Sequence, residues 1–77
     1  MWQVQNKALV KEFKFPDFKA ALAFVNQIGE LAEAANHHPD IQLGWGKVVV
    51  TLTTHSEGGV TEKDKQLAEQ IDGLQKD

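Results

Sequence analysis

The stretch PDFKAALAFVNQIGELAEAANHHPD, residues 16–40, decides the fold because it holds one long amphipathic segment between two prolines. Its first two residues mark a helix start, since proline suits the entry to a helix and an early carboxylate complements the exposed amides of the first turn. Pro39 disfavours helical geometry at the residue before it, so we expect a helix from about Asp17 towards Asn36. Apolar residues recur within it at three- and four-residue spacing and predict one buried stripe: Phe18, Ala21, Leu22, Val25, Ile28, Ala32 and Ala35, widened by Phe24 and Leu31. Gly29 costs about 1 kcal/mol relative to alanine inside a helix, which we interpret as the cost of a close backbone approach.

Two β-prone segments precede this helix and two follow it. Trp2–Val4 and Ala8–Phe15 are separated by three residues that include Asn6, and because asparagine tolerates turn geometry they predict a hairpin. After the helix, residues 40–55 form two predicted strands with a reversal at Gly46. The first of these strands is expected to place three apolar side chains on one face: Ile41, Leu43 and Trp45. In the second strand, Val48, Val50, Leu52 and Thr54 alternate with Val49, Thr51, Thr53 and His55, so His55 is expected to project with the threonines, away from the core.

A second helix is expected to close the chain. Gly58 and Gly59 break the preceding strand, and Thr61 stands three residues before Asp64, which is the spacing of a capping box. Apolar residues follow at helical spacing: Leu67, Ala68, Ile71 and Leu74. The order strand, strand, helix, strand, strand, helix favours an α+β fold, a four-stranded antiparallel sheet with both helices packed on one face.

The composition bounds the size and the partners of the protein. At 77 residues the chain is expected to form a single domain over residues 1–77, near the size at which one core leaves little net stability. It contains no cysteine, so disulfides and thiolate metal centres are excluded, and we expect self-association or unusually good packing to supply the missing stability. The net charge of −3 opposes direct binding to nucleic acid. No apolar run or N-terminal pattern indicates a membrane span or a secretion signal, so we expect no membrane association and a cytoplasmic location.

The three histidines of the chain lie in two places, His37 and His38 at the expected helix end and His55 after the last strand. On a helix, Glu33 and His37 share a face, so their pairing would orient the imidazole and favour its protonated form. The residues alone leave three interpretations open. In the first, the histidines only end a helix, where cationic rings favour the dipole, and occupy an exposed loop. In the second, they bind a metal together with Glu33, although no familiar ligand spacing is present. In the third, they carry out metal-free acid/base chemistry near neutral pH.

Other polar and aromatic residues give weaker signals. Asp64 is interpreted as a helix-start residue rather than a catalytic carboxylate. Trp2 and Trp45 are interpreted as packing or interface aromatics. The sequence holds no phosphate loop, serine elbow or paired-carboxylate arrangement, which disfavours most hydrolase and nucleotide-binding functions.

Three segments together resemble the pterin-4a-carbinolamine dehydratases, and they cover nearly the whole chain: FKFPDFKAALAFV, ELAEAANHHPDI and GKVVVTLTTHSEGGVTEKDKQLA. The most specific part is Glu33 followed by His-His-Pro at residues 37–39, then Thr54 and His55, then the helix start at residues 61–64. Because the chain begins almost at its first tryptophan-bearing strand, it is most similar to the short prokaryotic form of the family.

The resemblance implies loss of water from a 4a-hydroxytetrahydropterin to give the quinonoid dihydropterin, which recycles the pterin cofactor of aromatic amino acid hydroxylases. This elimination needs one proton removed from N5 and one delivered to the departing C4a hydroxyl. The pterin is the substrate, and the resemblance implies neither a metal nor a cofactor. By family analogy His37 and His55 transfer the protons, His38 helps to hold the pterin, and Glu33 is the candidate for orienting His37. The implied substrate-binding residues are Asn36, His37, His38, Pro39, Thr53, Thr54, His55, Ser56 and Asp64.

The resemblance also implies partners and an alternative function. The family assembles as dimers or as tetramers built from dimers, so we expect a homodimer or a homotetramer that supplies the missing stability. Asn36 stands where many members have aspartate, and Ile41 where many have an aromatic residue beside the pterin, which bears on rate and substrate preference. The alternative is a non-catalytic dimerisation or assembly-factor module of the same fold, against which the retained histidines argue.

Overall fold

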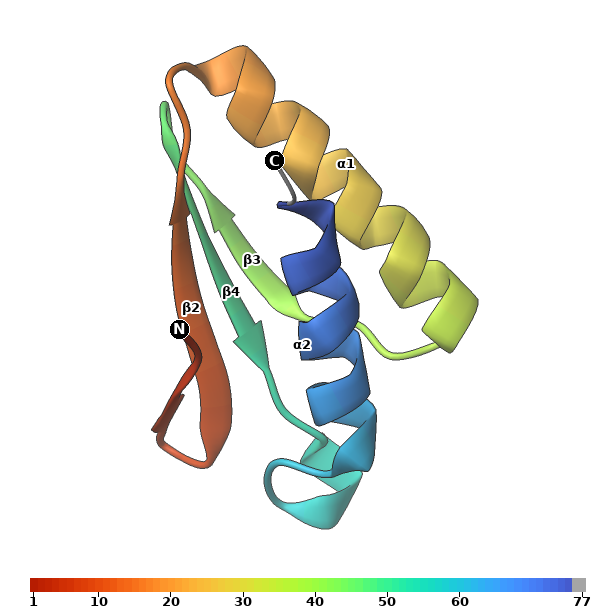
Figure 1. Ribbon diagram of the computed structural model, residues 1–77. Coiled ribbons are helices and arrows are strands. Elements are labelled where there is room, and N and C mark those ends of the chain that lie inside the picture. Colours follow the sequence, from red (N-terminus) through yellow and green to blue (C-terminus); the bar gives the residue numbers. More distant parts are fainter. Residues whose placement is uncertain (76–77) are drawn as a thin grey trace.

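The computed structural model describes residues 1–75 of the chain, and its elements follow the predicted order (Figure 1). Strands β1 (Gln3–Gln5) and β2 (Ala8–Lys14) precede the long helix α1 (Phe18–Ala35), and strands β3 (Asp40–Leu43) and β4 (Lys47–Leu52) follow it. A short 3-10 helix, η1 (His55–Glu57), then leads to helix α2 (Glu62–Leu74). Within residues 1–75 the strands form one antiparallel sheet in the order β1-β2-β4-β3. The predicted α+β class and the sheet are therefore confirmed.

Turn chemistry explains where the strands and the first helix begin and end. Asn6 and Lys7 have positive φ angles of 51° and 63°, as the two central residues of a tight hairpin turn require, and they join β1 to β2. Asp17 caps α1, because its carboxylate accepts a hydrogen bond of 2.8 Å from the backbone amide of Ala20. The expected strand placement of Trp45 is wrong, since β3 ends at Leu43 and the Trp45 side chain is 71% exposed in the turn that follows.

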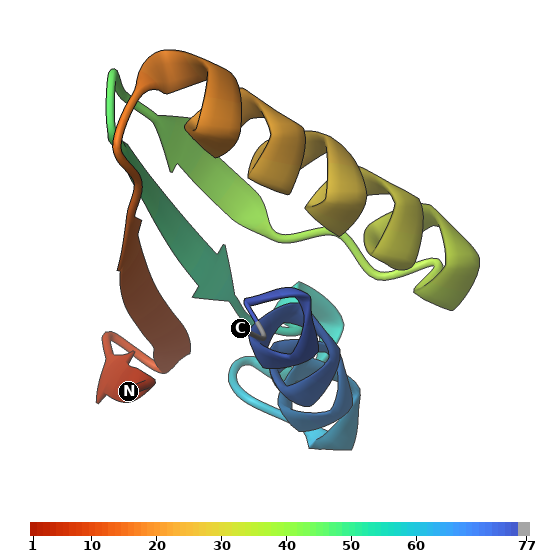
Figure 2. The same ribbon diagram turned by 45° about the horizontal axis from the view of Figure 1, so that its top comes forward.

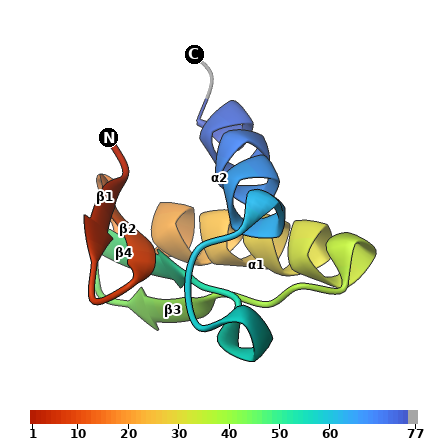
Figure 3. The same ribbon diagram turned by 90° about the horizontal axis from the view of Figure 1, so that it is seen from below.

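The core lies between one face of the sheet and both helices, which sit on the same side of it (Figures 2 and 3). Residues of β2, β4, α1 and α2 form this cluster: Phe13, Val48, Val50, Leu52, Ala21, Phe24, Ile28, Leu67, Ala68 and Ile71. The ring of Phe24 lies 4.8 Å from that of Phe13 and 5.0 Å from that of Phe15, measured between centroids. The predicted buried stripe of α1 is therefore rotated. Phe24 is at its centre, and Phe18, Leu22 and Ala35 are exposed because this aromatic contact sets which face meets the sheet.

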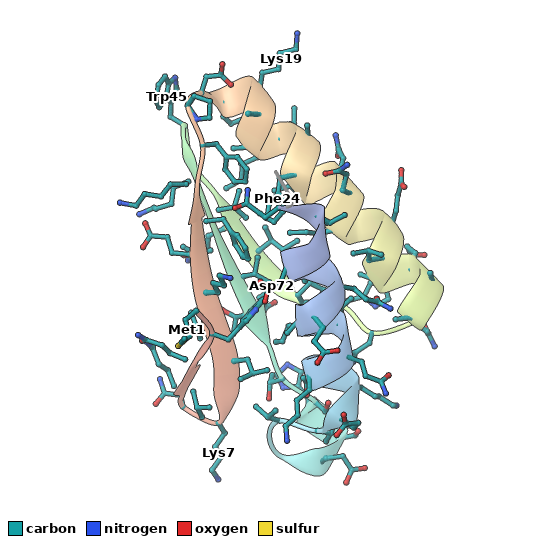
Figure 4. The ribbon with its side chains drawn as sticks, viewed as in Figure 1. Met1, Lys7, Lys19, Phe24, Trp45 and Asp72 are labelled. Atoms are coloured by element: carbon teal, nitrogen blue, oxygen red, sulfur yellow. The ribbon has the colours of Figure 1, made fainter. Side chains whose placement is uncertain are left out.

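A polar contact ties the last turn of α2 to the first hairpin. The indole nitrogen of Trp2 donates to the carboxylate of Asp72 at 3.1 Å, and the ammonium of Lys11 contacts the same carboxylate at 2.7 Å (Figure 4 labels Asp72). The Trp2 ring also packs edge-on against Phe13, with centroids 6.0 Å apart. Trp2 is thus a packing aromatic, as expected, and it also carries a hydrogen bond across the fold. None of the helices within residues 1–75 has the length and apolar character needed to cross a membrane.

Gly29 was interpreted as a position of close backbone approach, but the structure shows such an approach at Gly46 instead. A Cβ atom on Gly29 would meet nothing within 4 Å, so the close approach expected at this helix position is wrong. Gly46 is the position that needs it, because a Cβ there would lie 2.7 Å from the carbonyl oxygen of Phe15. The same two residues are joined by a hydrogen bond of 2.8 Å from the Phe15 amide to the Gly46 carbonyl, so the chain cannot easily separate them.

We therefore expect Gly46→Ala to lower the free energy of unfolding by about 1–3 kcal/mol, the usual cost of an overpacked site. The matched variant Gly29→Ala is expected to raise it by about 0.5–1 kcal/mol, because alanine is the better helix former and open space surrounds the new methyl group. Urea denaturation of the two variants and the wild type measures both changes. Equal stability of Gly46→Ala and the wild type would contradict the packing described for this turn.

Candidate active site

The end of α1 determines where the histidine pair points. Asn36 adopts the left-handed conformation, with φ 53° and ψ 42°. Its backbone amide donates to the carbonyl of Glu33 at 3.2 Å, and the amide of His37 donates to the carbonyl of Ala32 at 3.1 Å. This pair of bonds is a Schellman motif. The helix thus ends where expected, but the left-handed turn at Asn36 ends it, ahead of Pro39.

The expected pairing of Glu33 with His37 is wrong. The carboxylate of Glu33 instead contacts Nε2 of His38 at 2.5 Å, and both of these side chains are exposed. The physical reason is the turn at Asn36, which takes His37 off the helix, so the four-residue spacing no longer places it on the face of Glu33.

His37 pairs with Asp64 of α2. The distance from its Nε2 atom to Oδ1 of Asp64 is 2.5 Å, the His37 side chain is 12% exposed, and the Asp64 side chain is fully buried. Asp64 also completes the predicted capping box with Thr61. Asp64 is therefore a helix-start residue, as expected, but it is also the partner of the histidine. The sequence analysis assigned that partnership to Glu33, and the spacing of Thr61 and Asp64 predicted only the capping box.

Donors from three residues converge on the Asp64 carboxylate. Besides His37, the hydroxyl of Thr54 donates to it at 2.7 Å and the backbone amide of Thr61 donates at 2.8 Å. Burial by itself raises the pKa of Asp64, but the bonds from His37, Thr61 and Thr54 outweigh it and lower the pKa below the usual value. The group is therefore an ionised acceptor at neutral pH, so the proton in the short contact belongs to Nε2 of His37.

This arrangement leaves the other ring nitrogen of His37 available. Among residues 1–75, no hydrogen bond holds Nδ1 of His37, and no buried side-chain nitrogen or oxygen lacks a partner, so Nδ1 is not sealed inside the protein. With Nε2 tied to Asp64, Nδ1 of the neutral ring carries a lone pair. The pair is thus arranged for proton transfer.

The other predicted residues follow β4, belong to η1 or precede and begin β3. His55 begins η1 directly after the buried Thr54, and both His55 and Ser56 are exposed. The hydroxyl of Thr53 donates to the carbonyl of Lys7 at 3.0 Å, so it holds the first hairpin. The structure therefore joins His37, Thr54 and Asp64 through hydrogen bonds and joins Glu33 to His38 separately. Pro39 is partly buried where the chain enters β3, and Ile41 packs against the core.

Two cavities open beside the network. His37 lines one of about 300 Å³ together with Ala35, Leu67 and three polar residues of α2, which are Lys63, Gln66 and Gln70. The second, of about 320 Å³, is lined by Thr54, Glu57, Thr61, Glu62 and Lys63. These volumes are at the lower end of the range for small-molecule sites, which suits a compact heterocycle better than a long ligand. The part of the chain that the structure describes contains no group of three or more histidine, aspartate or glutamate side chains that could hold a metal ion.

The fold and the paired imidazole and carboxylate define a small α+β protein with a candidate proton-transfer site. Residues 1–74 match the sequence pattern of the family described as pterin 4 alpha carbinolamine dehydratase. A protein of Metallosphaera sedula is 47% identical over 75 residues, which are 97% of this chain and 78% of that protein. A protein of Roseiflexus sp. strain RS-1 is 52% identical over 73 residues, which are 95% of this chain and 78% of that protein. Both carry the name "Putative pterin-4-alpha-carbinolamine dehydratase".

Solved structures agree with the sequence match. A transcriptional coactivator/pterin dehydratase from Brucella melitensis superposes with a TM-score of 0.91 at 40% identity, covering 95% of this chain and 80% of that one. A pterin dehydratase-like protein described as a RuBisCO assembly factor in the alpha-carboxysome superposes with a TM-score of 0.78 at 27% identity, covering 96% of this chain and 86% of that one. The chain belongs to the pterin-4a-carbinolamine dehydratase family.

We expect Asp64→Asn to lower the free energy of unfolding by about 2–4 kcal/mol at pH 7, because three donors lose their charged acceptor. Because the folded-state pKa of Asp64 is lowered, its stabilisation is present above the unfolded value of about 3.9 and is lost as the pH falls through the folded value. The gap between variant and wild type should therefore shrink on acidification.

Urea denaturation at pH 7, 5 and 3 measures that gap. Asp72→Asn is the matched control, since it changes the same chemical group on the same helix at a partly exposed site and is expected to cost under about 1 kcal/mol. A gap for Asp64→Asn that is equally large at pH 3 and pH 7 would contradict the ionised, hydrogen-bonded carboxylate.

Proposed function

We propose that this protein catalyses the loss of water from a 4a-hydroxytetrahydropterin, the 4a-carbinolamine, to give the quinonoid dihydropterin. It would then be a hydro-lyase, as the names of its relatives indicate for those proteins. The observation that carries the proposal is the 2.5 Å contact between His37 and the buried Asp64, beside a cavity that His37 lines. Family membership supplies the reaction, and the contact supplies a group suited to it.

His37 is the base in this proposal. Its Nδ1 atom accepts the proton from N5 of the pterin, while its Nε2 proton stays in the hydrogen bond to Asp64. The carboxylate fixes the tautomer and stabilises the imidazolium, which is the role that a buried aspartate has beside a catalytic histidine. The electron pair left on N5 forms the C4a–N5 double bond as the C4a–O bond breaks.

His55 is the acid in this proposal. It delivers a proton to the departing C4a hydroxyl, which leaves as water, so that one proton is taken up and one is given in each turnover. Its exposed position on η1 allows it to regain a proton from solvent, as His37 loses its own. The reaction then needs no redox change, and the pterin is the substrate rather than a bound cofactor.

The other predicted residues would form the walls of the site. His38, held by Glu33, helps to keep the pterin in place, with Asn36 and Pro39 beside it. Thr53, Thr54 and Ser56 border the opposite wall, mainly through their backbone groups, because the hydroxyls of Thr53 and Thr54 already have partners. Such a reaction would recycle the pterin cofactor of aromatic amino acid hydroxylases. The protein would assemble as a homodimer or a homotetramer.

A second candidate function is that of an assembly factor without catalysis. The observation that favours it is the structural likeness to the RuBisCO assembly factor, at a TM-score of 0.78. The Brucella melitensis structure is more similar and its description includes dehydratase. The His37–Asp64 pair lies beside a cavity that His37 lines, which suits proton transfer, so dehydration is the first proposal.

We expect the wild-type protein to accelerate dehydration of freshly generated 4a-hydroxytetrahydropterin, followed by the absorbance of the quinonoid product. His37→Ala and His55→Ala should each lower kcat by about 10²–10⁴-fold, because each removes a group that transfers a proton. Lys19→Ala is the control, since Lys19 lies on the first turn of α1 (Figure 4), at the opposite end of that helix from His37 and His38, and should keep the wild-type rate. A wild-type rate no better than that of buffer would overturn the proposal and leave the assembly function.

The pH dependence of kcat should be bell-shaped, because His37 must be deprotonated and His55 protonated at the start of each turnover. Initial rates in constant-ionic-strength buffers between about pH 5 and 8 trace the two limbs. His55→Ala should remove the alkaline limb only, because the acid is lost and the base remains. A flat wild-type profile across this range would count against the paired roles.

A further inference from the structure

We propose that Asn36 is a positioning residue whose left-handed backbone turns His37 away from Glu33 and onto Asp64. This inference deepens the proposed function and rests on it, because the group being positioned is the proposed base. It differs from the expectation that Asn36 borders the substrate through its side chain. Here the backbone conformation of Asn36 positions His37, and its carboxamide has no part in that positioning.

Two carboxylates could pair with His37, and the backbone conformation of Asn36 determines which of them does. If residue 36 kept right-handed helical angles, His37 would continue α1 and share a face with Glu33, four residues earlier. The observed φ of 53° and ψ of 42° instead end the helix and place Nε2 of His37 2.5 Å from Asp64. These partners differ greatly, since Glu33 is exposed and Asp64 is fully buried.

Two backbone hydrogen bonds hold the turn once it has formed. The Asn36 amide bonds to the Glu33 carbonyl at 3.2 Å, and the His37 amide bonds to the Ala32 carbonyl at 3.1 Å. Ala32 is itself buried against the core, so the second bond ties the backbone of His37 to a fixed point of the fold. The direction of the imidazole therefore follows from the angles of residue 36 and leaves little freedom for compensation.

The residue type fits this role. Asparagine enters the left-handed region more readily than other residues with a Cβ atom, and glycine enters it most readily, whereas alanine and glutamine pay a steric cost there. The Asn36 side chain is exposed in the structure. Aspartate is similarly tolerant of this region, so it could serve the same turn.

Substitutions separate the backbone role from the side-chain role. Asn36→Gly and Asn36→Ala both remove the carboxamide, but only glycine keeps easy access to the left-handed region. We expect kcat of Asn36→Ala to be about 10-fold or more below that of Asn36→Gly with little difference in KM, since small displacements of a reacting group cost that much. Asn36→Gln, which keeps a carboxamide but not the turn, should resemble Asn36→Ala.

A second measurement does not depend on turnover. In ¹⁵N-labelled protein, the imidazole nitrogens of His37 report which ring nitrogen carries the proton. The wild type and Asn36→Gly should show the proton on Nε2, held by Asp64, and Asn36→Ala and Asn36→Gln should show exchange between tautomers. Thermal unfolding of each variant confirms that these spectra come from folded protein, and Asn36→Gln replaces Asn36→Ala if the latter does not fold.

The proposal is overturned if Asn36→Gly and Asn36→Ala lose activity equally, which would assign the effect to the missing carboxamide. It is also overturned if folded Asn36→Ala keeps the wild-type tautomer of His37. Failure of the proposed function has a different signature, because wild-type protein would then show no dehydration while the imidazole spectra would still distinguish the glycine and alanine variants.

Discussion

The hydrogen bonds to the buried carboxylate of Asp64 are the interactions on which the rest of the structure depends. An ionised group in a protein interior is tolerated only when its hydrogen bonds replace water, and here the donors come from three separate parts of the chain. Thr54 follows β4, Thr61 precedes α2, and His37 follows α1. One charge therefore joins the ends of three elements, and the positions of those elements determine where the candidate base lies.

The apolar core and the hydrogen bonds around Asp64 determine different features of the structure. The core, centred on Phe24 and the fully buried valines and leucine of β4, fixes how α1 and α2 lie on the sheet. That packing alone does not set the direction of the His37 side chain, because His37 lies beyond the end of α1. The left-handed residue Asn36 and the carboxylate of Asp64 set it, and they act on the backbone and on the ring of His37 respectively.

Local sequence patterns were sufficient to predict the element order and the capping box, because each depends on residues close together in the sequence. The sheet was inferred from the order of strands and helices, although its central pairing joins β2 to the distant β4. The partner of His37 could not be predicted in that way. It depends on the backbone angles of Asn36 and on where α2 packs against α1, and four-residue spacing pointed to Glu33 instead. The rotation of α1 was missed for a similar reason, since the contacts of Phe24 with Phe13 and Phe15 belong to the tertiary structure.

Asp64 has two roles, as the acceptor for His37 and as part of the cap of α2, and mutation can separate them over evolutionary time. Thr54 and Thr61 would still hold the carboxylate if the imidazole of His37 were absent, and α2 would still need its cap. A lineage that abandons catalysis therefore has reason to retain the aspartate and both threonines, whereas selection on the histidine is released. Asp64 is thus a marker of the fold, whereas under the proposed mechanism the histidines at 37 and 55 would distinguish an enzyme from a descendant that has kept only the scaffold.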